Sequence, residues 1–455
     1  MMAATPISLL DVPLEILLLI LRYCMSSELA ALCRTCKLFD SIARPQLYTD
    51  VKCDEEVVLV DDDSWRPKNY FVSFLGTIFR KPELGACVRC LDDGGNGCIS
   101  LTEKTQSHTL QNLRDISRHL GVELASLDDS EYAKDKTCES EEDLFPLLIP
   151  FVPNLKELIL TVPLSPQIPG ISPAICPPLR KLRSVSLIHS DTANGFSLGN
   201  ERCSIFLRLS PNLEKLTVHM CASVGDGLAL PNLRILIFTH SNIGSADLDF
   251  IISCTPRLES FRYTSGGCIV SDDREFSPAE ATMSLSRQKR TLRLIDIVQD
   301  EPYTTRYRPG TPWNGGAKSY RDFPVLETLV LAAVNIFPDL DDYLAYNNTS
   351  DLGLDEEVGG DESQVERDIR YIDLIPPSLR FFGVTGPSPL GSCIKLAAES
   401  AEGRFPNLKI VAFEAISDGE VALVEAAFAA AGVRCMTGFR GLSQMDEFNQ
   451  DLLRF

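Results

Sequence analysis

The chain has 455 residues and a formal net charge of −20, with 43 Lys and Arg against 63 Asp and Glu. This length exceeds what one ordinary hydrophobic core accommodates, so it predicts two or more domains or a repeat array. Phosphate backbones and anionic membranes bind clustered Lys and Arg. The acidic balance therefore argues against nucleic acid and membrane as partners.

The use of cysteine indicates a reducing compartment. The chain has 15 cysteines, an odd number, spread from Cys24 to Cys435 without a closely spaced framework. Many lie in apolar runs, where a reduced cysteine packs as a small hydrophobic residue. We therefore expect a cytoplasmic location, a nuclear location, or both.

The first apolar run is LEILLLIL, residues Leu14–Leu21. It is much shorter than the roughly 20 residues needed to cross a bilayer, and no basic stretch precedes it as in a signal peptide. Pro13 suits the first turn of a helix, and the carboxylate of Glu15 favours the same turn. We therefore expect a helix that ends near Tyr23 or Cys24, and neither a membrane anchor nor a targeting segment.

Two further short helices are expected before residue 50. Ser26 or Ser27 can cap the second, and the third holds Phe39 and Ile42 and ends before Pro45. A region of about forty residues rarely folds alone, and its first helix is apolar on nearly all sides. Either the rest of the chain covers that helix, or a partner protein does.

Residues 10–48 resemble an F-box. The matching phrases are VPLEILLLI at 12–20, EL at 28–29, TCKLF at 35–39 and SIA at 41–43. Val12, Cys24 and Glu28 depart from the residues that are commoner in that family. The resemblance covers less than a tenth of the chain.

The resemblance implies that these helices bind the Skp adaptor of a cullin–RING (SCF) ubiquitin ligase. On this interpretation the apolar run is half of an interface core. The alternative is a helical hairpin that caps the chain's own repeat array, because a binding helix and a buried helix share one periodicity. The residues that the resemblance places at the adaptor are Leu10, Pro13, Leu14, Ile16, Leu17, Ile20, Leu29, Leu32 and Phe39.

Beyond residue 50, one phrase recurs nine times: Leu, two residues, an apolar residue, one residue, and a second apolar residue. Most copies have Pro two residues before the Leu. A short strand with a return segment cannot bury its own face, so such units must stack on one another. The copies are NLKELIL, KLRSVSL, NLEKLTV, NLRILIF, RLESFRY, TLRLIDI, VLETLVL, SLRFFGV and NLKIVAF.

This pattern resembles an irregular leucine-rich repeat. The fold class that follows is α/β: an F-box-like helical module at 1–50, then a solenoid at 51–455 with a curved parallel sheet and outer helices. A weaker strand is expected at Ala86–Leu91 and a closing helix at Glu420–Ala431. Most copies lack the Asn or Cys that the family usually places after the strand.

Three segments interrupt the repeat. Residues 126–143 and 339–368 are acidic and poor in apolar residues, so we expect disordered loops. Residues 300–321 combine basic residues with aromatic residues, including Tyr307 and Trp313. This third segment could contact a target, as Arg and aromatic residues do in interfaces, or it could be a solvated insertion.

No catalytic motif stands out, so we expect neither an enzyme nor a cofactor. Cys33 and Cys36, and likewise Cys87 and Cys90, have zinc-ligand spacing but lack further ligands nearby, which favours ordinary thiols over a metal site.

The sequence therefore predicts a substrate-recognition adaptor that binds the Skp adaptor and an unknown protein target; the alternative is a leucine-rich scaffold without a link to ubiquitination. Strand residues between the apolar positions are the predicted target contacts: Lys215, Thr217, His219, Ser260, Arg262, Thr264, Thr328 and Phe381.

Overall fold

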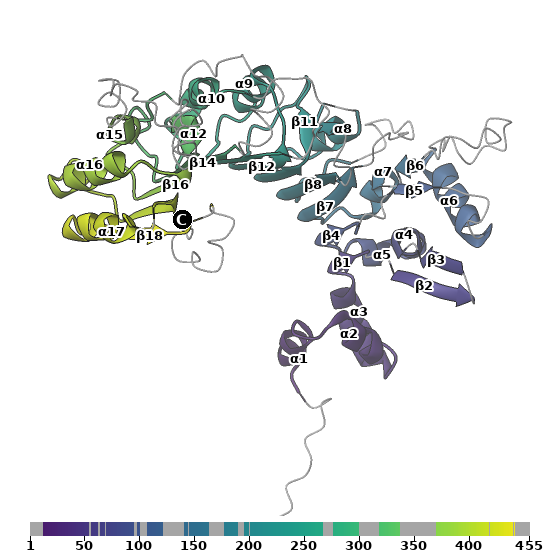
Figure 1. Cartoon of the computed structure of the whole chain (residues 1–455). Coiled ribbons are helices and arrows are strands. Elements are labelled where there is room, and N and C mark those ends of the chain that lie inside the picture. The colour runs from purple at the N-terminus through teal and green to yellow at the C-terminus, as the bar shows by residue number, and fades with distance from the viewer. Residues whose placement is uncertain are drawn as a thin grey trace, which may run out of the picture. The chain divides into compact units, whose positions relative to one another are not determined.

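Figure 1 shows the computed structural model of the chain. It divides into two compact units, Met1–Ser186 with Leu209–Asn212, and Leu187–Arg208 with Leu213–Phe455. The residues that it describes are 12–53, 56–61, 64–68, 70–94, 98–100, 107–121, 141–143, 145–162, 177–189, 195–199, 201–266, 276–299, 318–336, 370–417, 419–439 and 441.

The N-terminal helices are α1 (Leu14–Leu21), α2 (Ser26–Leu32) and α3 (Lys37–Leu47). The three expected helices are confirmed, with three differences. Met25, and not Ser26 or Ser27, is the N-cap of α2. Helix α1 ends before Tyr23, and α3 continues through Pro45. Pro45 lies in the last turn of α3, where its missing N–H removes only one helical hydrogen bond.

The rest of the first unit combines short strands with two longer helices. Helix α4 (Tyr70–Arg80) buries Phe71, Leu75 and Ile78 completely. The strand expected at Ala86–Leu91 is present as β4, but it begins later, at Cys90. The other elements are β1 (Asp50–Lys52), β2 (Glu56–Asp61), β3 (Ser64–Lys68), α5 (Pro82–Gly85), β4 (Cys90–Asp92), β5 (Cys98–Ser100), α6 (Ser107–Leu120), β6 (Glu141–Asp143), α7 (Phe145–Leu148), η4 (Ile149–Phe151) and β7 (Glu157–Val162).

A mostly parallel sheet of 12 strands, ordered β1-β4-β7-β8-β10-β12-β13-β14-β15-β16-β17-β18, is the main feature of the chain. Together with the helices it makes the chain α/β, as expected. Its later strands are β8 (Ser184–His189), β10 (Lys215–His219), β12 (Ile235–Ser241), β13 (Ser260–Ser265), β14 (Leu294–Val298), β15 (Thr328–Ala332), β16 (Phe381–Pro387), β17 (Ile410–Ala415) and β18 (Arg434–Thr437).

Each of the nine recurring phrases contains one strand of this sheet. In every phrase the Leu and the two following apolar residues are no more than 5% exposed. Alternate strand residues point to opposite faces of a sheet, so the two strand positions in each phrase line one buried face. The phrase therefore predicts both the strand and the face that it buries.

Helices connect the strands, and Figure 1 shows α9 and α10 on one side of β12 and β14. The expected closing helix is present as α17. The helices of this part are α8 (Glu201–Arg208), α9 (Ser245–Ser253), α10 (Pro278–Leu285), α12 (Ala333–Ile336), α15 (Arg370–Leu374), α16 (Leu390–Ala401) and α17 (Val421–Ala430), with η5 at Ser286–Gln288 and a small separate sheet of β9 (Phe196–Ser197) and β11 (Cys221–Ser223).

The sheet face opposite to the recurring apolar positions differs in solvent exposure along the second unit. On β10, β12 and β13 its residues are exposed or half-buried. Farther along it is covered, because Phe439 packs on Leu294, Val330, Phe381 and Ala412. This face is therefore open over β10–β13 and closed over part of β14–β17.

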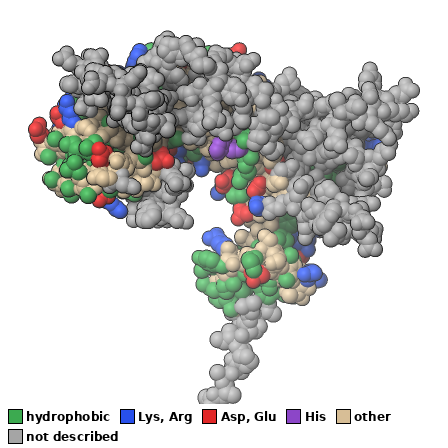
Figure 2. Space-filling model, viewed as in Figure 1, with side chains coloured by type: hydrophobic (Ala, Val, Ile, Leu, Met, Phe, Trp, Pro, Cys, Tyr) green, Lys and Arg blue, Asp and Glu red, His purple; other side chains and the backbone are tan. Residues whose placement is uncertain are grey.

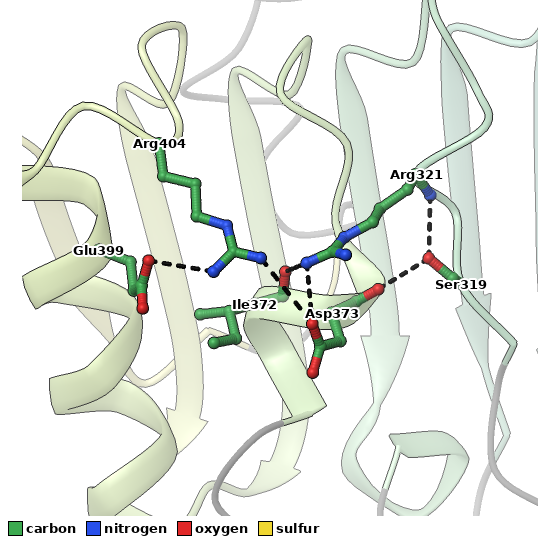
Figure 3. A network of polar contacts seen from close by, with 6 residues as sticks. All are labelled: Ser319, Arg321, Ile372, Asp373, Glu399 and Arg404. Atoms are coloured by element: carbon green, nitrogen blue, oxygen red, sulfur yellow. Dashed lines mark hydrogen bonds and ion pairs between the residues drawn. The ribbon is translucent and has the colours of Figure 1, made fainter.

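A polar network fixes two segments that are far apart in the sequence (Figure 3). The guanidinium of Arg321 donates 2.8 Å hydrogen bonds to the carbonyl of Ile372 and the carboxylate of Asp373. Arg404 lies 3.8 Å from the same carboxylate and pairs with Glu399 at 3.0 Å. The network joins residues 318–321 to α15 and α16.

Of the three interrupting segments, residues 141–143 form strand β6 and residues 318–321 take part in that network. The remaining parts of 126–143 and 300–321, with Tyr307 and Trp313, and all of 339–368 lie outside the described residues.

Candidate functional site

Helix α1 exposes most of its apolar side chains. Leu14, Ile16, Leu19 and Ile20 are 48%, 46%, 49% and 45% exposed. Only Leu17 and Leu21, one turn apart, are buried. Figure 2 shows hydrophobic side chains gathered over the part of the molecule that Figure 1 labels α1. Contiguous exposed apolar residues of this size mark an interaction surface.

The buried side of these helices forms a small core. Leu21, Leu29 and Ala43 pack together, with Leu32 and Leu47 partly buried against them. The backbone N–H of Met25 donates to the carboxylate of Glu28 at 2.8 Å, which holds the start of α2. This core positions α1 and leaves its other face uncovered.

The predicted adaptor contacts fall into two groups in the structure. Pro13, Leu14, Ile16 and Ile20 are exposed. Leu17, Leu29 and Phe39 are buried among these helices, and Leu32 is half-buried. Leu10 lies outside the described residues. The first group can contact a partner directly, whereas the buried residues hold α1 in place.

Sequence reasoning missed part of the exposed surface. Leu19 and Leu38 are 49% and 42% exposed, and Tyr23 is 84% exposed. Leu19 belongs to the same apolar run as the predicted residues, so the run itself was the signal for including it. Tyr23 follows the end of α1, and its exposure depends on where the helix stops.

One cysteine of each pair with zinc-ligand spacing has a raised pKa. Burial and the charge of Asp40 raise the pKa of Cys33, and burial with Asp50 and Glu157 raises the pKa of Cys90 to about 12. Zinc binds thiolates, which such shifts disfavour. No group of three or more metal-binding side chains occurs in the described part of the chain.

The predicted target contacts lie on the sheet face opposite to the recurring apolar positions. In-register partners on neighbouring parallel strands share a face, and register joins Lys215, Ile235, Ser260, Leu294, Thr328 and Phe381 across six strands. Lys215 is exposed, whereas Thr217, His219, Ser260, Arg262, Thr264 and Thr328 are half-buried.

Phe381 differs from these residues. It is 3% exposed, and its ring lies 5.8 Å from the ring of Phe439. The expectation that it faces an open surface is corrected, because Phe439 covers it.

Two histidines meet on the open part of this face. The ring centroids of His219 and His240 are 5.2 Å apart, and Nδ1 of His219 lies 2.9 Å from the hydroxyl of Thr239. Burial is the main cause that lowers the pKa of His219, and the other histidines add to it. The lowered pKa favours the neutral imidazole, which has one donor and one acceptor nitrogen.

Among known protein families, a model of the F-box-like family matches residues 9–54. No curated protein matches the chain. In the described residues, no helix combines the length and the hydropathy needed to cross a membrane. F-box domains generally bind Skp-type adaptors, and the exposed apolar face of α1 lies within the matched range. Residues 9–54 of this chain form an F-box-like domain.

Proposed function

We propose that the chain is the substrate-recognition adaptor of an SCF-type cullin–RING ubiquitin ligase. The F-box-like domain binds the Skp adaptor, and the sheet region binds a protein target. The observation that carries this proposal is the exposed apolar face of α1, because those side chains are stabilised only when another polypeptide removes them from water.

The competing interpretation, an N-terminal cap, requires the chain itself to cover α1. Four of the eight residues of α1 are apolar side chains that are nearly half exposed. A cap would bury these residues against the repeats, as the chain does with the three apolar positions of every recurring phrase. The contrast within one chain favours docking over capping.

We further propose that the region after residue 50 is an irregular leucine-rich-repeat solenoid. Support comes from nine similar phrases that each contain a parallel strand, with helices between many of them. The open sheet face on β10–β13 then serves as the target-binding surface.

The proposed mechanism needs no catalysis by this chain, and we propose that it is not an enzyme. Holding a target beside a ubiquitin-loaded enzyme raises the effective concentration of the reacting groups. The reduced thiols fit a ligase that acts in the cytoplasm, the nucleus, or both.

Co-purification from cells tests this proposal. Tagged wild-type chain should retain the Skp adaptor and the cullin, and Ile16→Asp should lose both while its melting temperature stays unchanged. Leu423→Asp is the matched control, because Leu423 is an exposed apolar residue of α17, far from α1 in sequence. Wild-type chain that retains neither protein, or equal loss from both variants, would refute the proposal.

A further inference from the structure

Arg262 and Asp296 are neighbours on the sheet face proposed to bind the target. Arg262 on β13 is in register with Asp296 on β14, so both side chains leave the same face. The same register row continues through Ile237 on one side and Val330 on the other. Arg262 and Asp296 therefore stand where the open part of the face meets the covered part.

Asp296 is buried without a hydrogen-bond partner. The residue is 6% exposed, and its Oδ1 atom has no hydrogen bond. Burial raises the pKa of this carboxyl to about 7, although the charge of Arg262 acts in the opposite direction. An unsatisfied buried polar atom costs folding free energy, so a native chain that keeps one calls for an explanation.

Arg262 is half-buried and does not neutralise its neighbour. It forms no ion pair with Asp296, or with any other residue that the structure describes. Its five N–H groups can therefore donate to a ligand. The pair thus offers donors from one side chain and an acceptor from the next.

The chemistry of the pair selects among ligands. An ammonium group that approached Asp296 would be repelled by Arg262, and a carboxylate that approached Arg262 would be repelled by ionised Asp296. A carboxamide avoids both repulsions, because its oxygen accepts from the guanidinium while its NH2 group donates to the carboxyl. It can pair with both side chains at once, and with the carboxyl through Oδ2, because Oδ1 is covered by the chain.

We propose that Arg262 and Asp296 bind the carboxamide side chain of an Asn or Gln in an extended segment of the target protein. This rests on the proposed function and specifies the class of target that the open face accepts. Thr217 and Ile237, both half-buried in the same row, flank the pair on the open side. Leu294, Val330 and Phe439 supply an apolar wall on the other side.

The test measures binding of the full chain to five libraries of synthetic nonapeptides. Their central residue is fixed as Asn, Gln, Asp, Lys or Leu, and the flanking positions are randomised. Wild-type chain should bind the Asn or the Gln library about tenfold more strongly than the other three, the factor expected for about one well-formed hydrogen bond. Asp296→Leu and Arg262→Gln should each lose this preference.

Arg290→Gln is the control, because it removes a positive charge from an exposed residue between η5 and β14, outside the strands that form the proposed target-binding face. It should keep the preference. A melting curve confirms that each variant is folded, and Asp296→Leu should fold because it replaces an unpaired buried carboxyl with an apolar group of the same branched shape.

Other outcomes overturn the proposal. Preference for the Asp library would show that Arg262 alone binds an anion, and preference for the Lys library would show that Asp296 alone binds a cation. Equal binding of all five libraries would show that the pair holds only water. Retention of the Skp adaptor is measured on the same preparations, so failure here is distinguishable from failure of the ligase proposal.

Discussion

Arg234 and Glu259 form a two-point ion pair across neighbouring strands of the sheet. Nε and Nη2 of Arg234 each donate a 2.8 Å hydrogen bond to one carboxylate oxygen of Glu259. Both residues directly follow the first Leu of a recurring phrase. Arg293 and Glu327 occupy the same place in later phrases and lie 3.1 Å apart.

This position is charged in all nine phrases, and its sign alternates through the central seven. Like charges on adjacent strands repel and opposite charges attract, so the alternation favours the observed strand order. The residues, in chain order, are Lys156, Arg183, Glu214, Arg234, Glu259, Arg293, Glu327, Arg380 and Lys409.

The Arg234–Glu259 pair should contribute modestly to stability. Its side chains are 53% and 35% exposed, so solvent weakens the attraction. A double-mutant cycle with Arg234→Gln and Glu259→Gln should give a coupling free energy of about 0.5 to 1 kcal/mol in chemical denaturation. The coupling should shrink in high salt. A coupling of zero at low salt would show that the Arg234–Glu259 pair does not stabilise the fold.

Two neighbouring residues of α1 should respond differently to the same change. Leu17→Ala removes a side chain that is 3% exposed and should lower the free energy of unfolding of the helical domain by about 2 to 4 kcal/mol. Ile16→Ala shortens an exposed side chain, so the free energy of unfolding should stay within about 0.5 kcal/mol of the wild-type value. Thermal denaturation followed by circular dichroism measures both. Equal losses would show that Ile16 is covered in solution.

The ionisation of Asp296 should make stability depend on pH. Its pKa in the folded chain is about 7, raised from 3.8, so between these values the folded chain holds a proton that the unfolded chain releases. Stability therefore falls as pH rises through this window and levels off above it. Asp296→Asn removes this pH dependence. The variant's free energy of unfolding should therefore exceed that of wild type by more at about pH 8 than at about pH 5, and the two differences should be separated by on the order of a few kcal/mol. Denaturant titrations at the two pH values measure this, and an equal advantage at both would contradict the shift.

The lack of a side chain at Gly383 leaves room for the Phe439 ring on the sheet. A Cβ atom at Gly383 would lie 2.8 Å from the Phe439 ring and 3.0 Å from Val330. Gly383→Val should therefore displace the ring, and Phe439→Ala should lower the free energy of unfolding by about 3 kcal/mol. Phe439→Leu, which keeps most of the apolar contact, should lose less. Chemical denaturation ranks the variants; a Phe439→Ala variant as stable as wild type would show that the ring does not pack there.

The strands were predictable from sequence because each phrase carries its own signal. Leu236 and Phe238 occupy alternate positions of β12 and are both buried. The other phrases have the same alternation of apolar residues, which predicts a strand with one buried face. The edge strands β1 and β18 lack the phrase and were not predicted. Local periodicity therefore identified the inner strands and missed both edges of the sheet.

The opposite face could be predicted only in part. Phe381 and Arg262 occupy equivalent kinds of position, yet Phe439, 58 residues after Phe381, buries the first and leaves the second open. The burial of Asp296 and its lack of a hydrogen-bond partner were likewise not predicted from the sequence. Such contacts depend on tertiary packing, which short-range patterns do not contain.

The apolar face of α1 was the part of the site that sequence specified best. The run LEILLLIL indicated a helix with too much apolar surface for its size, and the structure leaves Leu14, Ile16, Leu19 and Ile20 exposed. Sequence could not assign Leu17 to the inside, because the apolar positions in the run, buried or exposed, are all Leu or Ile. That division depends on packing against α3.

Titration calorimetry of the purified full chain with purified Skp adaptor tests the central claim most directly. The proposal predicts one adaptor per chain and a negative heat-capacity change, because apolar surface on α1 leaves water on binding. Binding should disappear in Ile16→Asp and persist in Leu423→Asp. A folded wild-type chain that gives no binding signal would contradict the claim that another polypeptide completes helix α1.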